Sequence, residues 1–450
     1  MKKVKALPAL AVLALFVVAP IGSLDFDFGG FLYNDTKLSV SQPASAPVFA
    51  IEQKDQLAAW LEARFGTTFS LSAQGSYTFT LERPYLFDLE SLKADWRILP
   101  LLRAEAGRLA MSDFTGLVLS HTLDGLRLSL ELPFSRITGS VGYSGLLFKP
   151  VSRILMSRSD SADQTNDAMF FAAPRLIEGM DALFPQLLLR QDLRLSLLFQ
   201  QDLRPDAAVI AAGEQQEIVS GLSGGKLSTQ YFGLGLSGPI VVPLYWDAFF
   251  YLSSGRTLSY VADSASGTGY SYQYQPILAY LGGIGFRLFM EEALFSRVEV
   301  RGIIASGDSD SDTLLEGNTE LSSGLFVPIS QISNWIAFSP QLGNILVVEG
   351  SYSLRPFAKS RAAALNRLQA LFKGAGFLRP TTGAISETGL NPSSTSLYLG
   401  TEAELILSYR PFSDLGLALS LGAFFPVAEA FTAADAEPKL AGRFELSFSF

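Results

Sequence analysis

Apolar and polar residues alternate in long segments along most of this chain, and this pattern constrains the fold more than any other feature. Segments 126–132, 190–199, 296–301 and 402–407 all show it, with mostly Leu, Val, Ala or Phe at every second position and mostly Arg, Glu, Asp or Ser between them. Successive side chains of a β-strand point to opposite faces, so each segment predicts a strand with one apolar and one charged face.

Soluble one-sided sheets and membrane β-barrels share this alternation. The composition and the number of segments favour the barrel. Charged residues are 17% of the chain, against roughly 25% in average globular proteins. Past residue 23, no apolar run approaches the ~20 residues that a membrane helix requires. We therefore expect an all-β fold, a transmembrane antiparallel β-barrel.

The last seven residues strengthen this interpretation. Phe444, Leu446, Phe448 and Phe450 form one face of a terminal strand, whereas the ends of soluble chains usually fray into water. The ending resembles the C-terminal signature of bacterial outer-membrane barrels, which implies recognition by the barrel assembly machinery. These four residues are the expected assembly signal.

The N-terminus predicts a cleaved secretory signal. Lys2, Lys3 and Lys5 precede an apolar core at residues 7–19 that is too short to span a bilayer. We divide the chain into a signal peptide at 1–23 and a single barrel domain at 24–450. Single-chain bacterial barrels have even strand numbers, and the remaining length favours about 18 strands, with 16 as the next choice.

Three segments interrupt the alternation and are interpreted as long loops: 149–186, 307–323 and 355–376. Apolar residues at helical spacing predict short helices near 174–184 and 361–373. Tyrosines and a tryptophan clustered between residues 245 and 280 are expected to form an interfacial aromatic girdle.

Charged faces opposite the apolar rows should line a water-filled lumen. Cations outnumber anions on these faces, although the whole chain has a net charge of −9. This distribution predicts a weak anion preference, with arginines holding carboxylates or phosphates by bidentate hydrogen bonds. The alternative is that the charges pair and merely brace the wall. The expected lumen-lining residues are Arg97, Arg103, Arg127, Arg190, Asp192, Arg194, Arg287, Arg297, Glu299, Arg301, Glu402 and Arg410.

Several short motifs in both halves of the chain resemble the alginate-export type of outer-membrane porin. They are Gly107-Arg108, the Asp124-Gly125 pair interpreted as a hairpin, Ser306-Gly307-Asp308, residues 399–402 and residues 421–426. The resemblance implies a monomeric, wide barrel whose loops fold over the lumen. No stretch carries the polysaccharide specificity of that family.

Enzymatic and cofactor chemistry find little support. His121 is the one histidine and hence the one candidate base for a barrel hydrolase with a Ser/His pair. One histidine and no cysteine cannot form a zinc site. Asp308, Asp310 and Asp312 suggest a calcium loop, but the later ligand positions of that template are absent. No metal and no cofactor are expected.

We therefore expect a channel for passive diffusion or export of hydrophilic solutes or oligosaccharides, seated in outer-membrane lipid of a diderm bacterium. The alternatives are a surface adhesin with a plugged lumen and the His121 hydrolase. Removing the three leader lysines leaves 31 basic against 43 acidic residues, a net charge near −12. This balance argues against nucleic acid as a partner.

Deletion of residues 447–450 should block assembly, because it removes two of the four aromatic and aliphatic residues that form the terminal signal. The measurement is the heat-dependent shift in gel mobility that closed barrels show in detergent. If the truncated chain inserts as well as the full chain, the terminal residues are not an assembly signal.

Overall fold

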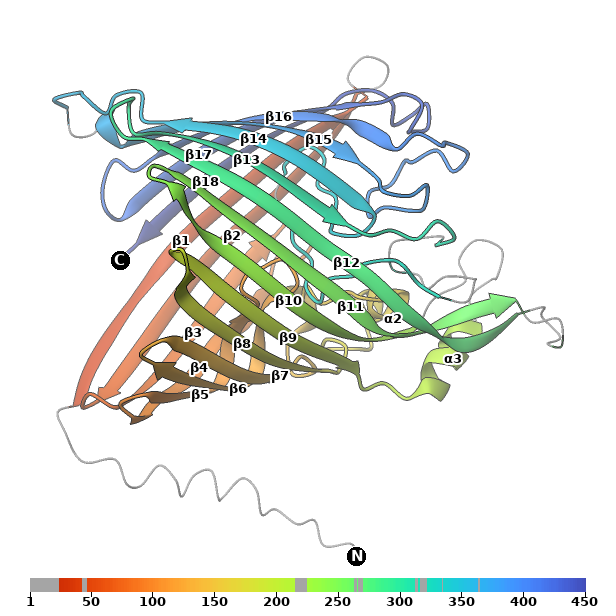
Figure 1. Ribbon diagram of the computed structural model, residues 1–450, viewed down its shortest axis with the longest axis horizontal. Helices are drawn as coiled ribbons and strands as arrows, with labels where there is room; N and C mark the ends of the chain where they lie inside the picture. Colours follow the sequence, from red (N-terminus) through yellow and green to blue (C-terminus); the bar gives the residue numbers. More distant parts are fainter. Residues whose placement is uncertain are drawn as a thin grey trace, which may run out of the picture.

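A closed antiparallel β-barrel of 18 strands forms the molecule in a computed structural model (Figure 1). The structure describes residues 24–42, 47–214, 225–262, 265, 270–311, 315, 322–333, 335–362 and 365–450. The expected strand number and the all-β class are thus confirmed. The proposed signal peptide, residues 1–23, lies outside the described residues.

Each strand pairs with its neighbours in the sequence. The strands are β1 Leu24–Ser41, β2 Val48–Phe65, β3 Phe69–Thr80, β4 Leu86–Leu99, β5 Leu102–Ser112, β6 Ser120–Leu132, β7 Ser135–Tyr143, β8 Arg175–Leu188, β9 Gln191–Asp202, β10 Lys226–Val241, β11 Leu244–Ala262, β12 Tyr270–Met290, β13 Ser296–Ala305, β14 Ile345–Leu354, β15 Leu368–Leu378, β16 Tyr398–Tyr409, β17 Leu415–Pro426 and β18 Lys439–Ser449.

Pairing of β1 with β18 closes the barrel. The register runs from Phe31 opposite Ser449 to Val40 opposite Leu440. Beyond it, the backbone N–H of Gly30 donates to the carbonyl of Phe450 at 2.9 Å, and the N–H of Phe450 donates to Gly30 at 3.0 Å. The last residue of the chain is therefore a hydrogen-bonded part of the seam.

The two ends of the barrel differ. At the end that holds the C-terminus, connections have two to five residues, apart from the 355–367 turn. The opposite end carries the long loops 144–174 and 306–344. By the usual pattern of outer-membrane barrels, the first is the periplasmic end and the second the extracellular end. We call them the turn end and the loop end.

Two helix predictions are wrong. Residues 175–184 belong to strand β8, and in the segment expected to be helical at 361–373 the described residues before β15 include one 3₁₀ turn, Leu365–Arg367. Pairing with neighbouring strands overrides local helical spacing in both places. The described helices are α2 Arg158–Thr165 and α3 Asp206–Glu214, both in loop-end loops, with a 3₁₀ turn at Lys149–Val151.

Apolar side chains cover the outside of the wall. On β9 the exposed residues Leu195, Leu197 and Phe199 alternate with buried residues on the inner face, and on β10 Phe232 and Leu234 are outward and exposed. Hydrocarbon solvates such a surface, and the closed ladder satisfies its backbone. None of the helices that the structure describes is long and apolar enough to cross a membrane.

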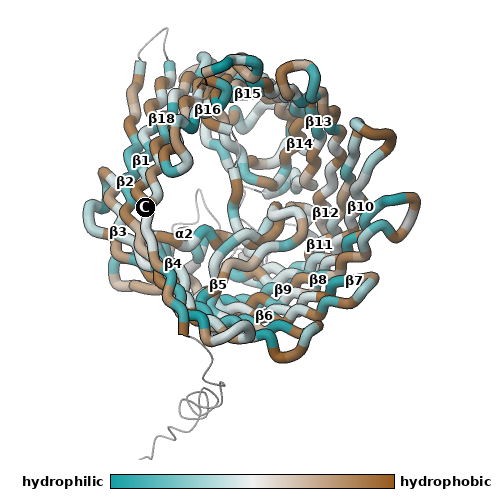
Figure 2. The backbone as a smooth tube through the Cα atoms, turned by 90° about the vertical axis from the view of Figure 1, so that its left-hand side faces the viewer, coloured by the Kyte–Doolittle hydropathy of each residue, from teal (hydrophilic) through white to brown (hydrophobic). Residues whose placement is uncertain are grey.

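Loops fill the loop-end half of the barrel interior. Figure 2, which looks along the barrel, shows chain segments crossing it. Val118, Phe326 and Ile329 are completely buried there, and the N–H of Ile329 donates to the carbonyl of Val118 at 2.8 Å. The hydrophobic core of this protein therefore lies inside the barrel, between inward wall residues and loop residues.

A carboxylate and an aromatic stack hold the 306–344 loop. Glu402 on β16 is completely buried and accepts the backbone N–H groups of Ile336, Ala337 and Phe338 at 2.8 to 3.3 Å. The Phe338 ring stacks on Phe424 of β17, with centroids 4.1 Å apart. These contacts fix the loop across the lumen.

Buried ion pairs hold the 144–174 loop. Arg175, at the start of β8, contacts Asp160 of α2 at 2.7 Å and Asp202 of β9 at 3.2 Å, and all three are buried. Arg204 contacts Asp160 at 2.8 Å and Asp163 at 3.1 Å. Burial raises the pKa of Asp163 despite that arginine. Breaking one partner of such a cluster would leave a buried charge uncompensated.

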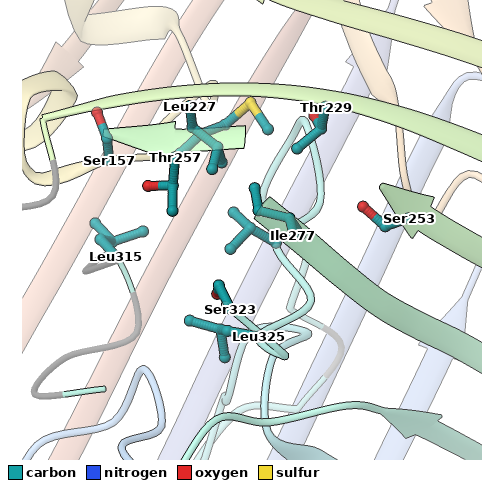
Figure 3. A pocket seen from close by; sticks show the side chains of 11 residues that line it. Ser157, Leu227, Thr229, Ser253, Thr257, Ile277, Leu315, Ser323 and Leu325 are labelled. Atoms are coloured by element: carbon teal, nitrogen blue, oxygen red, sulfur yellow. The ribbon is translucent and has the colours of Figure 1, made fainter. Parts of the chain in front are cut away.

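The junction between these loops and the wall is tight. Ser157 before α2, Thr257 on β11, Ile277 on β12 and Leu325 of the 306–344 loop surround a void of about 10 Å³ (Figure 3). A void of this size holds about one water molecule. The void itself is too small for a solute.

Replacing Leu195 or Leu405 by Arg should destabilise the barrel by roughly 2–4 kcal/mol if the position lies near the bilayer midplane. Both residues lie on the outward face. Ser408→Arg is the matched control, because Ser408 is on the inward face of β16. The free energy of unfolding in lipid measures the difference, and equal losses on both faces would contradict a lipid-facing exterior. Ser196 is unsuitable as a control, since only 1% of it is exposed.

Candidate functional site: an arginine-lined cavity in the lumen

A cavity of about 360 Å³ lies inside the barrel, in the half nearer the turn end. Strands β9 to β13 form one side, and the 113–119 loop between β5 and β6 forms the other. The lining residues are Phe114, Thr115, Arg194, Gly235, Leu236, Ser237, Asp247, Ala248, Phe249, Arg287, Glu299 and Arg301.

Three arginines and two acids meet in this cavity. Arg287 donates to Asp247. Glu299 lies 3.4 Å from Arg297, which is outside the cavity lining. Arg194 and Arg301 form no ion pair with any residue that the structure describes. The cavity therefore presents an excess of positive charge.

The Nε–H groups of Arg194, Arg287 and Arg301 are buried, and no described group accepts a hydrogen bond from them. Guanidinium groups pair with carboxylates and phosphates in a planar, bidentate geometry. The excess of guanidinium groups over acids in the cavity lining therefore suits an anion.

Strand register places the arginines. Arg194 on β9 lies opposite Gly235 on β10, Gly235 opposite Phe249 on β11, and Phe249 opposite Gly283 on β12. A Cβ at Gly283 would lie 2.5 Å from the Phe249 ring, so only glycine leaves room for that ring. The Arg301 guanidinium lies 5.9 Å from the centroid of the same ring, within cation–π range.

The 113–119 loop forms a fixed wall. Asp113 is only 4% exposed. One of its oxygens accepts from the N–H groups of Val118 and Leu119 at 3.1 and 2.8 Å, and the other accepts from the Tyr251 hydroxyl at 2.8 Å. The Phe114 ring stacks on Tyr251, with centroids 5.3 Å apart. Tyr251 on β11 therefore anchors the loop at two points.

Other expected lining residues are placed elsewhere. Arg103 and Arg127 pair with Asp95 and Glu105 on the adjoining strands. Glu402 is occupied by the 306–344 loop. The N–H of Gln186 donates to Asp192, close to the turn end. Arg97 is on β4 and Arg297 on β13, each within three residues of a turn.

Two expected lining residues lie off the strands. Arg190 is in the two-residue turn between β8 and β9, with φ of 65°, and Arg410 follows β16 in the 410–414 turn. The alternation of apolar and polar residues continues past the strand ends into these turns, so it placed both arginines on an inward face that the turns do not have. The structure thus brings together Arg194, Arg287, Glu299 and Arg301 out of the twelve.

Phe114, Asp247 and Tyr251 were missed by the sequence argument. Tyr251 was assigned to the aromatic girdle, but it is completely buried inside the barrel. A usable signal existed, because residues 247, 249 and 251 share one face of a strand. The contribution of the 113–119 loop had no local signal, since it depends on a contact between residues 138 positions apart.

The described residues around the candidate catalytic histidine and the candidate calcium loop are not arranged for catalysis or for metal binding. His121 lies on β6, and its Nε2 accepts the backbone N–H of Arg153 at 3.2 Å. The Asp124-Gly125 pair lies within the same strand and is no hairpin. Asp308 accepts from the N–H groups of Asp310 and Gly324. Asp312 is outside the described residues, among which no acidic or histidine group is arranged for a metal.

Neither a protein-family model nor a curated protein sequence matches the chain. Solved structures from Pseudomonas aeruginosa do. OpdO matches at 14% identity and a TM-score of 0.56, over 95% of this chain and 97% of its own. OpdL matches at 14% identity with a TM-score of 0.55, over 95% of this chain and 99% of its own. OccK2 (OpdF), solved in complex with glucuronate, matches at 12% identity with a TM-score of 0.53, over 94% of this chain and 98% of its own.

These likenesses extend over nearly the whole chain and concern the fold. Together with the closed ladder and the apolar exterior, they give the chain the fold of an 18-stranded transmembrane β-barrel. The alginate-export resemblance is not confirmed by them.

Tyr251→Phe should loosen the 113–119 loop and raise the ionic conductance of the lumen. The substitution removes a hydrogen bond to a carboxylate, which contributes about 1.5–3 kcal/mol. Tyr352→Phe is the control, because Tyr352 on β14 faces outward and is 38% exposed. Single-channel recordings measure the change, and identical conductance and current noise in both variants would contradict an anchoring role.

Proposed function

We propose that the protein is an outer-membrane channel for passive diffusion of small hydrophilic solutes, with a preference for anions. The observation that carries this proposal is the convergence of Arg194, Arg287 and Arg301 on one lumen cavity that only two acids line. Conductance of the refolded protein in a planar bilayer tests it directly.

The mechanism follows from charge placement. A solute carboxylate entering the cavity accepts hydrogen bonds from Arg194 and Arg301, which form no ion pair within 4 Å among the described residues. Glu349 lies opposite Arg301 in the pairing of β13 with β14. Asp247 and Glu299 line the same space and weaken the hold, so that the solute can leave again. Conduction requires a site that is attractive enough to enter and weak enough to leave.

Sugar carboxylates fit this site best. A cavity of about 360 Å³ accommodates a monosaccharide acid, with Thr115 and Ser237 offering hydroxyls beside the guanidinium groups. One further observation supports this class: OccK2, similar in fold, was solved with glucuronate.

A plugged barrel that acts as a surface adhesin is the second candidate, favoured by the loops that fill the loop-end half of the lumen. Phe326 and Phe338 of the 306–344 loop are completely buried inside the barrel. An adhesin of this kind conducts no ions under conditions in which a channel does, so the bilayer measurement separates the two. A hydrolase gains no support, because no described hydroxyl donates to His121.

Arg301→Glu should lower the anion preference, because it replaces an unpaired guanidinium in the cavity by a carboxylate. Arg136→Glu is the matched control: Arg136 lies near the turn end, 2.9 Å from Glu131, and its side chain is 56% exposed. The zero-current potential in a salt gradient measures the selectivity. A clear cation preference in the parent protein would overturn the anion assignment, even if the protein conducts.

A further inference from the structure

One connection at the turn end differs from all the others there. The turn of residues 355–367 has 13 residues between β14 and β15, where its counterparts have two to five. It contains Arg355, Lys359, Arg361 and Arg367 and no acidic residue, in a chain whose net charge is −9. Figure 1 shows it at the same end of the barrel as the C-terminus. We call it the basic turn.

The basic turn lies against its two spatial neighbours. The guanidinium of Arg355 lies 5.9 Å from the ring centroid of Phe295, in the 291–295 turn. Nη1 of Arg367 donates to the carbonyl of Pro411, in the 410–414 turn, at 3.1 Å. The four cations of the basic turn outnumber the three acids of the neighbouring turns, Glu291, Glu292 and Asp414.

Large apolar side chains are exposed on the same three turns. Phe295 is 56% exposed, Phe357 44%, Leu365 46% and Phe412 67%. Basic residues interleaved with exposed aromatic and aliphatic residues are typical of surfaces that lie in the headgroup region of a membrane. Exposure of these apolar side chains to water is unfavourable, whereas the headgroup region of a membrane would cover them.

A groove of about 630 Å³ connects the basic turn to the lipid-facing wall. Leu415 and Phe448, opposite each other on β17 and β18, form its apolar side on the outward face of the barrel. Arg367, Ser413 and Asp414 form its polar rim, and Phe412 flanks it. Hydrocarbon contacts and a guanidinium group thus occur in one groove, as a lipid with a charged headgroup requires.

We propose that this groove binds an anionic phospholipid of the leaflet at the turn end, with its phosphate at Arg367 and its acyl chains along Phe412, Leu415 and Phe448. The apolar side of the groove continues into the lipid-facing wall, which favours a lipid over a soluble peptide. The site lies outside the lumen and is independent of transport.

Native mass spectrometry of the full chain tests the proposal, after reconstitution in nanodiscs of equal phosphatidylethanolamine and phosphatidylglycerol. Near an anionic membrane surface each cation contributes about 1 kcal/mol, or about fivefold in affinity. Arg367→Gln should therefore reduce retained phosphatidylglycerol about fivefold and leave phosphatidylethanolamine unchanged. Arg367→Lys should restore most of the retention, because a phosphate also binds a point charge.

The control is Arg83→Gln, which removes an exposed cation from the 81–85 loop at the loop end and should change nothing. Heat-dependent gel mobility shows that each variant is folded. Three results would overturn the proposal: equal retention of both lipids by the parent, equal losses in the Arg367 and Arg83 variants, or displacement of the lipid by millimolar inorganic phosphate. The last would identify a site for soluble anions.

Discussion

Every part of this structure depends on the closure of one backbone hydrogen-bond ladder. Hydrocarbon offers no partner for an N–H or C=O group, so a sheet in a membrane cannot have a free edge. The seam between β1 and β18, extended by the Gly30 and Phe450 hydrogen bonds, removes that edge. The ladder is satisfied regardless of which side chains it carries. The inward face is therefore free to carry charge, and the outward face must be apolar.

Eighteen strands enclose more space than wall side chains can fill. The chain fills part of this space with its own loops, so the residues normally found in a domain core, such as Val118, Phe326 and Phe338, come from connections between strands. Glu402 and Arg175 link these loops to the wall through buried hydrogen bonds and ion pairs. The cavity that remains open lies beside these loops, where the arginines of β9, β12 and β13 face the 113–119 loop.

Alternation along the chain was sufficient to predict the barrel and its outward face, because those properties repeat locally at every second residue. The strand number followed from the chain length and from the even strand numbers of single-chain barrels. It could not predict which inward charges meet. Arg194, Arg287 and Arg301 come together through the register of five strands, and Arg190 is excluded by a turn of two residues. Tyr251 was assigned to the membrane surface because burial by a distant loop leaves no trace in the sequence around it. Helical spacing at 174–184 failed to predict the structure because β8 pairs with β7 and β9, and this pairing overrides the local pattern.

The contact between the 113–119 and 306–344 loops has a consequence for how the protein folds. The N–H of Ile329 donates to the carbonyl of Val118 inside the barrel. Directly after the 113–119 loop, the N–H of Ser120 donates to the hydroxyl of Ser330, 210 residues away. Contacts of such separation form slowly, since a long stretch of chain must be ordered before they stabilise anything. The hairpins can pair in order along the chain, whereas the interior core requires both loops and most of the wall between them. The lumen therefore narrows last, after a wider and emptier barrel has already formed.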